Sequence, residues 1–221
     1  MASASDPASY YFNGQLAVWQ MLSLLKKSSF NIRTASHIME FGCGTAQKIR
    51  LFRRIKGVKL TGTDVFANSV DWCKGQIGGI RFYLNELNPP LTFANDDEFD
   101  LIFALSVFTH IPLDAQQVWL EEPRRVMRPG GYFYCTLLGS RHIRVMLNDN
   151  QRAKLAAEGE LTLNADDPEA SYSTQVTGSW DVFQTRNEVL RSFGEVFEVM
   201  DYISGETVSM NQDIIIVRKP A

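Results

Sequence analysis

A glycine-rich turn is the feature that most constrains how this chain can fold. Residues 36–47 read SHIMEFGCGTAQ, in which the apolar segment His37–Phe41 contains one acid, Glu40, and leads directly into Gly42-Cys43-Gly44. Glycines at such a place permit a tight turn and a close approach of the backbone to a ligand, which a larger side chain would block. The segment predicts a short strand, a ligand-cradling turn and then a helix over Thr45–Ile55.

The same turn disfavours two common phosphate-binding motifs. A dinucleotide fingerprint that starts at Gly42 requires its third glycine at position 47, where the chain has Gln47. A P-loop requires a Gly-Lys-Ser/Thr run, which the sequence lacks. A nicotinamide-dependent oxidoreductase therefore stays only as an alternative.

An acid follows the second predicted strand. Val58–Thr63 (VKLTGT) is typical of a strand and leads into Asp64. In doubly wound folds, an acid about 20 residues after the glycine turn hydrogen-bonds a ribose diol. The alternative role of Asp64 is to cap a helix predicted over Phe66–Lys74. We favour the ribose role because the turn and the acid occur in the right order.

Strands and helices alternate through the middle of the chain. The continuous apolar run Phe99–Val107 predicts a central strand that is covered on both faces. Asp114 and Gln117 form a capping-box pattern at the start of the next helix. The other elements predicted here are strands over Ile80–Leu84 and Tyr132–Leu137, a helix over Ala115–Met127 and a turn over 128–131. This alternation predicts right-handed crossover units in an open sheet, with the ligand at the carboxyl ends of the strands.

The two ends of the chain are predicted as follows. Met1–Ser9 is small and polar and is expected to be disordered, whereas residues 10–221 are expected to form one domain. Gln15–Lys27 is predicted as an amphipathic helix, because Leu16, Trp19, Leu22 and Leu25 recur at helical spacing. Near the C-terminus, Thr185 and Glu188 form a capping box before a helix over Arg186–Phe193. Two strands, Val196–Ile203 and Asp213–Val217, are expected to complete the sheet as an antiparallel edge hairpin.

An insertion at about 139–180 follows the fifth predicted strand. It contains two predicted helices, Arg141–Leu147 and Gln151–Glu158, and a polar segment, Asn164–Ser173. Since it emerges from the edge of the sheet where ligands bind, we expect a mobile lid over the substrate. Trp180 is a large aromatic residue at its end that could close on a ring.

Several of these segments, in order, resemble the motifs of the class I S-adenosylmethionine (SAM)-dependent methyltransferases. The segments are the acid-x-Gly-x-Gly pattern Glu40–Gly44, Gly62–Asp64, Asn88-Pro89-Pro90-Leu91, FDLIFALSVFTHIP and RVMRPGGYFYCT. An SVFTH segment after the fourth strand is similar to a bacterial branch that acts on small molecules or saccharides. The resemblance spans about Tyr11–Thr136, and it departs from the family at Ala46, where a third glycine is frequent, and at Pro123 inside a helix.

The resemblance implies a fold, a cofactor and a set of binding residues. The fold would be α/β: a doubly wound, mostly parallel seven-stranded sheet with an antiparallel C-terminal edge hairpin, the Rossmann-like methyltransferase fold. Glu40 would lie near the methionine end of SAM, Asp64 at its ribose, and Asn85 or Glu86 near its adenine. The residues implied to bind the cofactor are Tyr11, Glu40, Gly42, Cys43, Gly44, Asp64, Val65, Asn85, Glu86, Leu105 and Ser106.

His110 is the candidate general base, because it follows the fourth strand closely and an imidazole titrates near neutral pH. The alternative is a structural histidine in the turn Thr109–Pro112. His142 is a weaker candidate, and His37 lies at the opposite, amino end of the first strand.

The function predicted from these features is methyl transfer from SAM to a small-molecule or sugar-type acceptor. A formal net charge of −3 gives no long-range attraction to nucleic acid or an anionic membrane. A protein or nucleic-acid methyltransferase and a SAM-binding regulator without turnover remain alternatives. The three cysteines have no metal-ligand spacing and suggest free thiols in the cytoplasm, and no segment is typical of a signal peptide or a membrane span.

Overall fold

A seven-stranded sheet forms the centre of the protein. The computed structural model describes residues 6–163, 180–208 and 211–221. The strand order is β3-β2-β1-β4-β5-β9-β8. Strands β1 to β5 are parallel to one another, whereas β9 is antiparallel to both β5 and β8. The strands are β1 (His37–Phe41), β2 (Lys59–Asp64), β3 (Arg81–Leu84), β4 (Phe99–Ala104), β5 (Met127–Leu137), β8 (Glu198–Ile203) and β9 (Asp213–Arg218). The predicted doubly wound, mostly parallel sheet with an antiparallel C-terminal hairpin is confirmed.

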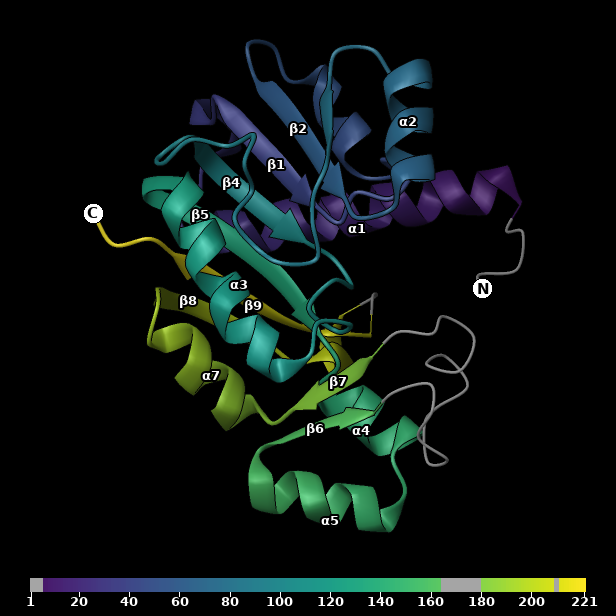
Figure 1. Ribbon diagram of the computed structural model, residues 1–221, viewed down its shortest axis with the longest axis vertical. Coiled ribbons are helices and arrows are strands. Elements are labelled where there is room, and N and C mark those ends of the chain that lie inside the picture. Colours follow the sequence, from purple (N-terminus) through teal and green to yellow (C-terminus); the bar gives the residue numbers. More distant parts are fainter. Residues whose placement is uncertain (1–5, 164–179, 209–210) are drawn as a thin grey trace.

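Helices cover both faces of this sheet (Figure 1). The helices are α1 (Pro7–Lys27), α2 (Ala67–Gln76), α3 (Leu113–Val126), α4 (Ser140–Met146), α5 (Asp149–Glu158) and α7 (Arg186–Gly194). Alternate residues of β4 face opposite sides: Leu101 and Phe103 pack with α1 and α2, and Ile102 and Ala104 pack with α3 and α7. Burial on both faces explains why β4 is apolar from Leu101 to Ala104.

A second, smaller sheet is built by the insertion after β5. Its strands β6 (Glu160–Leu163) and β7 (Asp181–Gln184) are antiparallel, and a bridge between Leu138 and Phe183 joins it to the main sheet. The two strands were not predicted, whereas the helices α4 and α5 were. The predicted polar segment Asn164–Ser173 lies outside the described residues.

The first helical segment differs from its prediction in two respects. α1 begins at Pro7, where the side chain of Asp6 accepts a hydrogen bond from the backbone N–H of Ala8, so residues 7–9 are helical and not disordered. The buried face of α1 consists of Gly14, Ala17, Val18, Met21 and Leu25, and Trp19 is 68% exposed. Leu25 belongs to both the predicted and the observed face, but the buried face is rotated so that Ala17 and Val18 are buried and Trp19 is not.

The segment after the glycine turn is not the α-helix that was predicted over Thr45–Ile55. It consists of turns followed by a 3₁₀-helix, η2 (Ile49–Arg54). Gly44 and Ala46 have φ angles of +50° and +57°, which a right-handed helix does not allow. These residues therefore delay the start of helical structure.

Three further boundaries differ from their predictions. β4 ends at Ala104, three residues before the predicted Val107. The predicted capping box of α3 does not form, because the Asp114 carboxylate accepts a hydrogen bond from the adjacent Ala115 N–H and Pro112 occupies the cap position. The predicted turn 128–131 is part of β5, which accommodates it by a register shift against β4. By contrast, the Thr185 side chain does accept a hydrogen bond from the Glu188 N–H, as predicted for α7.

The three cysteines are free, as predicted, and all three are buried. Within the described part of the chain, we find no helix with the length and apolar character that crossing a membrane requires.

Candidate functional site

A cavity of about 580 Å³ opens at the carboxyl ends of β1 to β4. This volume lies within the range of about 300–1,000 Å³ that is typical of small-molecule sites. The cavity is lined by Phe41, Gly42, Asp64, Val65, Phe66, Asn85, Leu87, Leu105, Ser106, Val107, His110, Ile111, Trp119 and Trp180. Seven of the predicted site residues are among them: Gly42, Asp64, Val65, Asn85, Leu105, Ser106 and His110.

The two glycines of the turn have different roles. Gly42 has a φ of +73°, and a Cβ atom there would lie 2.3 Å from Cγ2 of Val107, so no other residue fits. Gly44 also has a positive φ, but within the described structure a Cβ atom on it would meet no heavy atom within 4 Å. Gly42 therefore lets the segment after β4 pack against the turn, whereas Gly44 leaves its backbone open to a ligand.

Asp64 connects the turn to the end of β2. Its carboxylate accepts hydrogen bonds from the backbone N–H of Gly44, at 2.7 Å, and from that of Phe66, at 3.0 Å. The residue is only 6% exposed, yet it lines the cavity. The helix-cap alternative is not formed, since the cap position of α2 is Phe66 and has no side-chain cap bond. A carboxylate has about four acceptor sites, so lone pairs remain for the hydroxyl groups of a ligand.

Glu40 supports the turn from behind. Its side chain is 1% exposed and accepts a hydrogen bond from the Ile49 N–H at 3.0 Å. Burial raises the pKa of its carboxyl group to about 7, and the nearby charge of Lys48 opposes this shift. Glu40 does not line the cavity, so in this structure its carboxyl group fixes the peptide that follows the turn.

The end of β3 contributes a polar group and an apolar rim. Asn85 accepts a hydrogen bond from the Thr63 hydroxyl at 2.7 Å and donates one to the Glu86 carbonyl at 2.8 Å. Asn85 lines the cavity, whereas Glu86 is exposed and does not. Phe66 and Leu87 are 69% and 76% exposed beside it and form an apolar wall that suits a flat ring. Sequence reasoning missed these two residues, although each lies within two residues of a predicted polar site residue.

The end of β4 is held by a hydrogen-bond network. Ser106 has a φ of +59°, and its N–H donates to the Thr136 hydroxyl at 2.8 Å. The hydroxyl groups of Ser106 and Thr136 both donate to Oε1 of Gln212, at 2.9 and 2.7 Å. Thr136 and Gln212 were not predicted, because β5 and the residue before β9 are far from Ser106 in the sequence. The network keeps Leu105 and Ser106 at the cavity wall.

His110 lies at the part of the cavity nearest the insertion. Its Nδ1 is 2.8 Å from the carbonyl oxygen of Trp180 and 3.7 Å from Oδ1 of Asp181. A carbonyl oxygen only accepts hydrogen bonds, so Nδ1 carries the proton of the neutral ring and Nε2 is the acceptor. The His110 side chain is 36% exposed and lines the cavity, as a general base requires.

Other residues considered from the sequence lie outside the cavity lining. Tyr11 is 52% exposed, and the guanidinium group of Arg50 lies 4.3 Å from its ring centre. Cys43 is buried, and burial raises the pKa of its thiol far above the usual range. His37 is buried at the amino end of β1, where burial lowers its pKa to about 4. Burial also lowers the pKa of His142 in α4.

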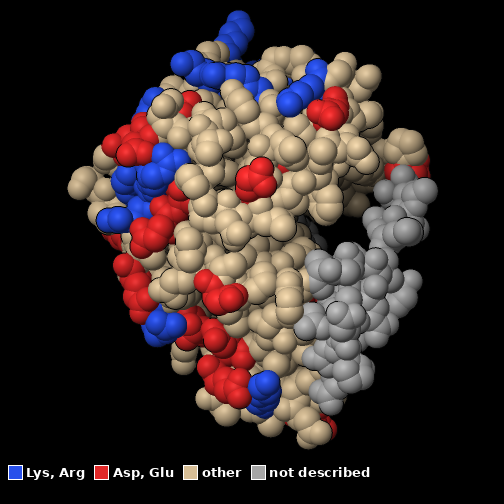
Figure 2. Space-filling view, viewed as in Figure 1, with Lys and Arg blue, Asp and Glu red and all other residues tan. Residues whose placement is uncertain are grey.

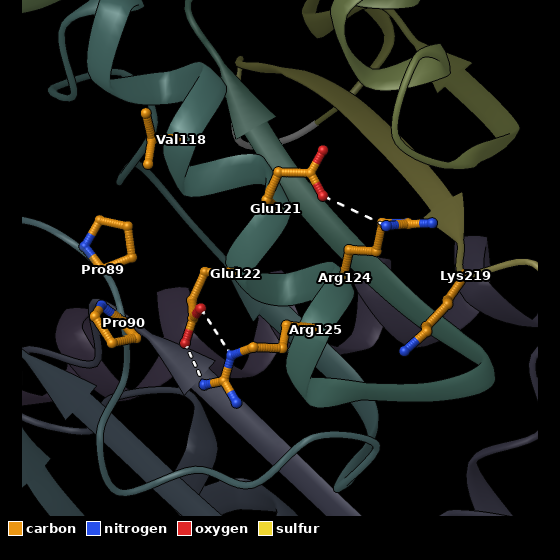
Figure 3. A pocket seen from close by; sticks show the side chains of 8 residues that line it. All are labelled: Pro89, Pro90, Val118, Glu121, Glu122, Arg124, Arg125 and Lys219. Carbon is orange, nitrogen blue, oxygen red and sulfur yellow. Dashed lines mark hydrogen bonds and ion pairs between the residues drawn. The ribbon is translucent and has the colours of Figure 1, made fainter.

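A second cavity, of about 560 Å³, lies along α3 and next to the Pro89-Pro90 segment (Figure 3). Each basic side chain that lines this cavity forms an ion pair with an acid. Arg125 pairs with Glu122, Arg124 with Glu121, and Lys219 with Asp97. Acidic and basic side chains also alternate on the surface near α3 and α7 (Figure 2). Arg125 also donates to Asp96 and to the Ala94 carbonyl, which joins the loop before β4 to α3, and Lys219 joins that loop to the segment after β9. We assign these contacts a structural role. The described residues contain no group of three or more His, Cys, Asp or Glu placed to hold a metal ion.

Comparisons with known proteins give a match to one family model and several solved structures with a similar fold. A family model described as a methyltransferase domain matches residues 39–135, which include the glycine turn, Asp64 and His110. Among solved structures, an S-adenosylmethionine-dependent methyltransferase from Mesorhizobium loti has a TM-score of 0.62 at 13% identity, over 89% of this chain and 96% of that chain. The glycopeptide N-methyltransferase MtfA, complexed with (S)-adenosyl-L-homocysteine, has a TM-score of 0.65 at 10% identity, over 94% of this chain and 90% of that chain. PH0226 from Pyrococcus horikoshii OT3 has a TM-score of 0.65 at 14% identity, over 95% and 91% of the two chains.

These likenesses confirm the Rossmann-like methyltransferase fold. The match of residues 39–135 shows in addition that this segment is similar in sequence to methyltransferase domains.

Proposed function

We propose that this protein transfers a methyl group from SAM to a small-molecule or sugar-type acceptor. The observation that carries the proposal is the cavity at the carboxyl ends of β1 to β4, inside the region that matches a methyltransferase domain. Its lining residue Asp64 accepts a hydrogen bond from the N–H of Gly44, which lies in the glycine turn and outside the cavity lining.

The lining residues fit the parts of SAM in order along the sheet. Asp64 accepts hydrogen bonds from the ribose hydroxyls, and the rim formed by Val65, Phe66 and Leu87 encloses the adenine beside Asn85. The backbone around Gly44 receives the methionine part, with Glu40 and Cys43 behind it. Leu105 and Ser106 border the methyl group.

The acceptor occupies the rest of the cavity. This region is lined by Val107, His110, Ile111 and Trp180, and Trp180 is 39% exposed. An indole stacks well on a sugar or an aromatic ring, and it also attracts the positive charge of a sulfonium.

Bound SAM would supply an electrophilic methyl group whose carbon–sulfur bond breaks, with the electron pair left on sulfur, as the bond to the acceptor forms. The protein holds the acceptor in line and excludes water. His110 takes the proton of the acceptor at Nε2 and becomes an imidazolium, which later releases the proton to solvent.

The test is a transfer assay with methyl-labelled SAM and pooled metabolites and saccharides. We expect label in at least one pool, and a decrease of about two to four decades in transfer for His110→Gln. His142→Gln is the matched control and should keep the wild-type rate, because His142 does not line the cavity. Tight SAM binding without transfer to any pool would favour the regulator, and absence of SAM binding would contradict the proposal.

A further inference from the structure

We propose that Gln116 of α3 is a positioning residue for His110, because its buried side-chain amide fixes the turn that carries the imidazole. This inference rests on the proposed function, since the place of His110 matters for transfer only if an acceptor binds beside it. The sequence pattern at the start of α3 drew attention to Asp114 and Gln117, and not to Gln116.

The side-chain amide of Gln116 bonds to the turn on both sides of His110. Its Nε2 donates to the Phe108 carbonyl at 2.7 Å and to the Ile111 carbonyl at 2.8 Å. A carbonyl oxygen only accepts hydrogen bonds, so the amide nitrogen must occupy this place, and each of its two N–H groups has a partner. One side chain therefore fixes the two peptides that bracket Thr109 and His110.

Backbone hydrogen bonds complete the support of residues 107–112. The Thr109 carbonyl accepts from the Val182 N–H of β7 at 2.9 Å. The Pro112 carbonyl accepts from the backbone N–H of Gln116 itself at 2.8 Å. Gln116 thus donates three hydrogen bonds to this segment, two from its side chain and one from its backbone.

Burial makes the two side-chain bonds hard to replace. Gln116 is 3% exposed and Phe108 is fully buried, so water is not at hand for a carbonyl that loses its donor. The Phe108 ring packs against Phe133 and Phe193 and fixes that end of the turn in the core. Without the amide, the turn is therefore expected to shift at its other end, where His110 lines the cavity.

A second side chain of α3 makes a similar contact to another wall of the cavity. Trp119, one turn after Gln116, donates from Nε1 to the Leu87 carbonyl at 3.0 Å. Leu87 belongs to the rim proposed for the adenine, whereas His110 faces the acceptor region. Gln116 itself does not line the cavity, so it acts through the turn, and one helix offers a comparison between the transfer side and the cofactor side.

Nuclear magnetic resonance of the full chain tests the inference without an acceptor. Gln116→Met keeps a side chain of similar length and removes both donors, so we expect the ring signals of His110 to shift or broaden. Gln117→Met is the matched control and should keep the wild-type ring signals, because Gln117 is exposed on the same helix. The signals are assigned by their loss in His110→Gln.

The wild type alone gives a second test. Because the Gln116 amide is buried and bonded, its side-chain protons should exchange with solvent much more slowly than those of Gln117. Equally fast exchange of both amides would overturn the inference, even if Gln116→Met does not fold. A folded Gln116→Met protein with wild-type ring signals of His110 would also overturn it.

Calorimetry with S-adenosylhomocysteine separates positioning of His110 from support of the whole cavity. Gln116→Met should bind it within about twofold of the wild type, whereas Trp119→Phe, which loses the contact to the adenine rim, should bind about fivefold more weakly. In the transfer assay, kcat should fall about 10- to 100-fold in Gln116→Met with little change in the KM for SAM. A loss of affinity in Gln116→Met as large as that in Trp119→Phe would contradict a role confined to His110.

The same samples distinguish this inference from the proposed function. Failure of the wild type to bind S-adenosylhomocysteine would count against the proposed function alone. The ring signals of His110 and the exchange of the Gln116 amide would still decide whether Gln116 fixes the turn.

Discussion

Glu40 shows how burial sets the charge of one residue beside the site. Its pKa is raised from 4.5 to about 7, first by loss of water and against the attraction of Lys48. At pH values between 4.5 and about 7, the folded protein keeps a proton on Glu40 that the unfolded chain has released. The folded state thus binds more protons in this window, so the free energy of unfolding decreases as the pH rises through it.

The first prediction compares the wild type with Glu40→Gln. Between pH 5 and pH 8 the wild type should lose roughly 2–3 kcal/mol of stability relative to the variant, since each pKa unit corresponds to about 1.4 kcal/mol. Urea unfolding at a series of pH values measures this difference. His37, whose pKa is lowered to about 4, changes stability in the opposite sense but does so in both proteins. If the free energies of unfolding of the wild type and Glu40→Gln changed with pH in parallel, folding would not raise the pKa of Glu40.

Ala46 has a left-handed backbone conformation, which glycine adopts more readily than any other residue. Its φ is +57° and its side chain is fully buried. The left-handed conformation costs an L-residue about 1–2 kcal/mol. A glycine would remove that cost but would also lose a buried methyl group, worth about 0.8 kcal/mol, and would make the unfolded chain more flexible by about 0.4–1 kcal/mol.

The second prediction follows from this balance. Ala46→Gly should change the free energy of unfolding by less than about 1 kcal/mol, whereas Ala46→Val should reduce it by about 1–3 kcal/mol, because a β-branched residue tolerates a positive φ poorly. Thermal and urea unfolding of the two variants give the comparison. Equal losses of stability in both variants would mean that the volume of the side chain, and not the backbone conformation, determines the effect of a substitution at this position.

At the scale of elements, α3 carries two neighbouring arginines in different surroundings. Arg125 bonds to Glu122, which is 5% exposed, and to the carbonyl groups of Leu91 and Ala94. Arg124 is half exposed and pairs with the exposed Glu121 at 3.5 Å. Figure 3 shows both pairs on the same helix.

The third prediction uses Arg124 as the matched control. Arg125→Ala leaves the buried Glu122 without its cation and should cost about 2–4 kcal/mol, the lower part of the range allowing for the partial exposure of Arg125. Arg124→Ala should cost no more than about 1 kcal/mol. Urea unfolding of the two variants and the wild type distinguishes these values. Similar small losses would mean that the loop before β4 does not depend on this pair.

The sequence predicted best those elements whose burial is periodic or continuous. β4 is apolar from Leu101 to Ala104 because both of its faces are covered there, and the Thr185 cap of α7 depends on residues three positions apart. The start of η2 was not predictable in this way, since it depends on the φ angles of Gly44 and Ala46. β6 and β7 were missed because each has only four residues and because residues 164–180 separate them in the sequence.

At the scale of the whole molecule, the order of the motifs predicted where the site forms. Gly42, Asp64, Asn85, Ser106 and His110 follow successive strands, and parallel strands bring their carboxyl ends to one edge. The partners that hold these residues could not be predicted. Thr136 and Gln212 come from β5 and from the approach to β9, and only the folded chain brings them to the site.

The central claim is that Asp64 and the glycine turn bind SAM, and calorimetry with S-adenosylhomocysteine and with NAD tests it most directly. Loss of a charge-assisted hydrogen bond costs about 1.5–3 kcal/mol, so Asp64→Ala should bind S-adenosylhomocysteine about 10- to 100-fold more weakly than the wild type. Asp71→Ala, in α2, is the control and should bind like the wild type, because Asp71 does not line the cavity. Equal affinity of the wild type and Asp64→Ala, or tight binding of NAD without binding of S-adenosylhomocysteine, would contradict the account.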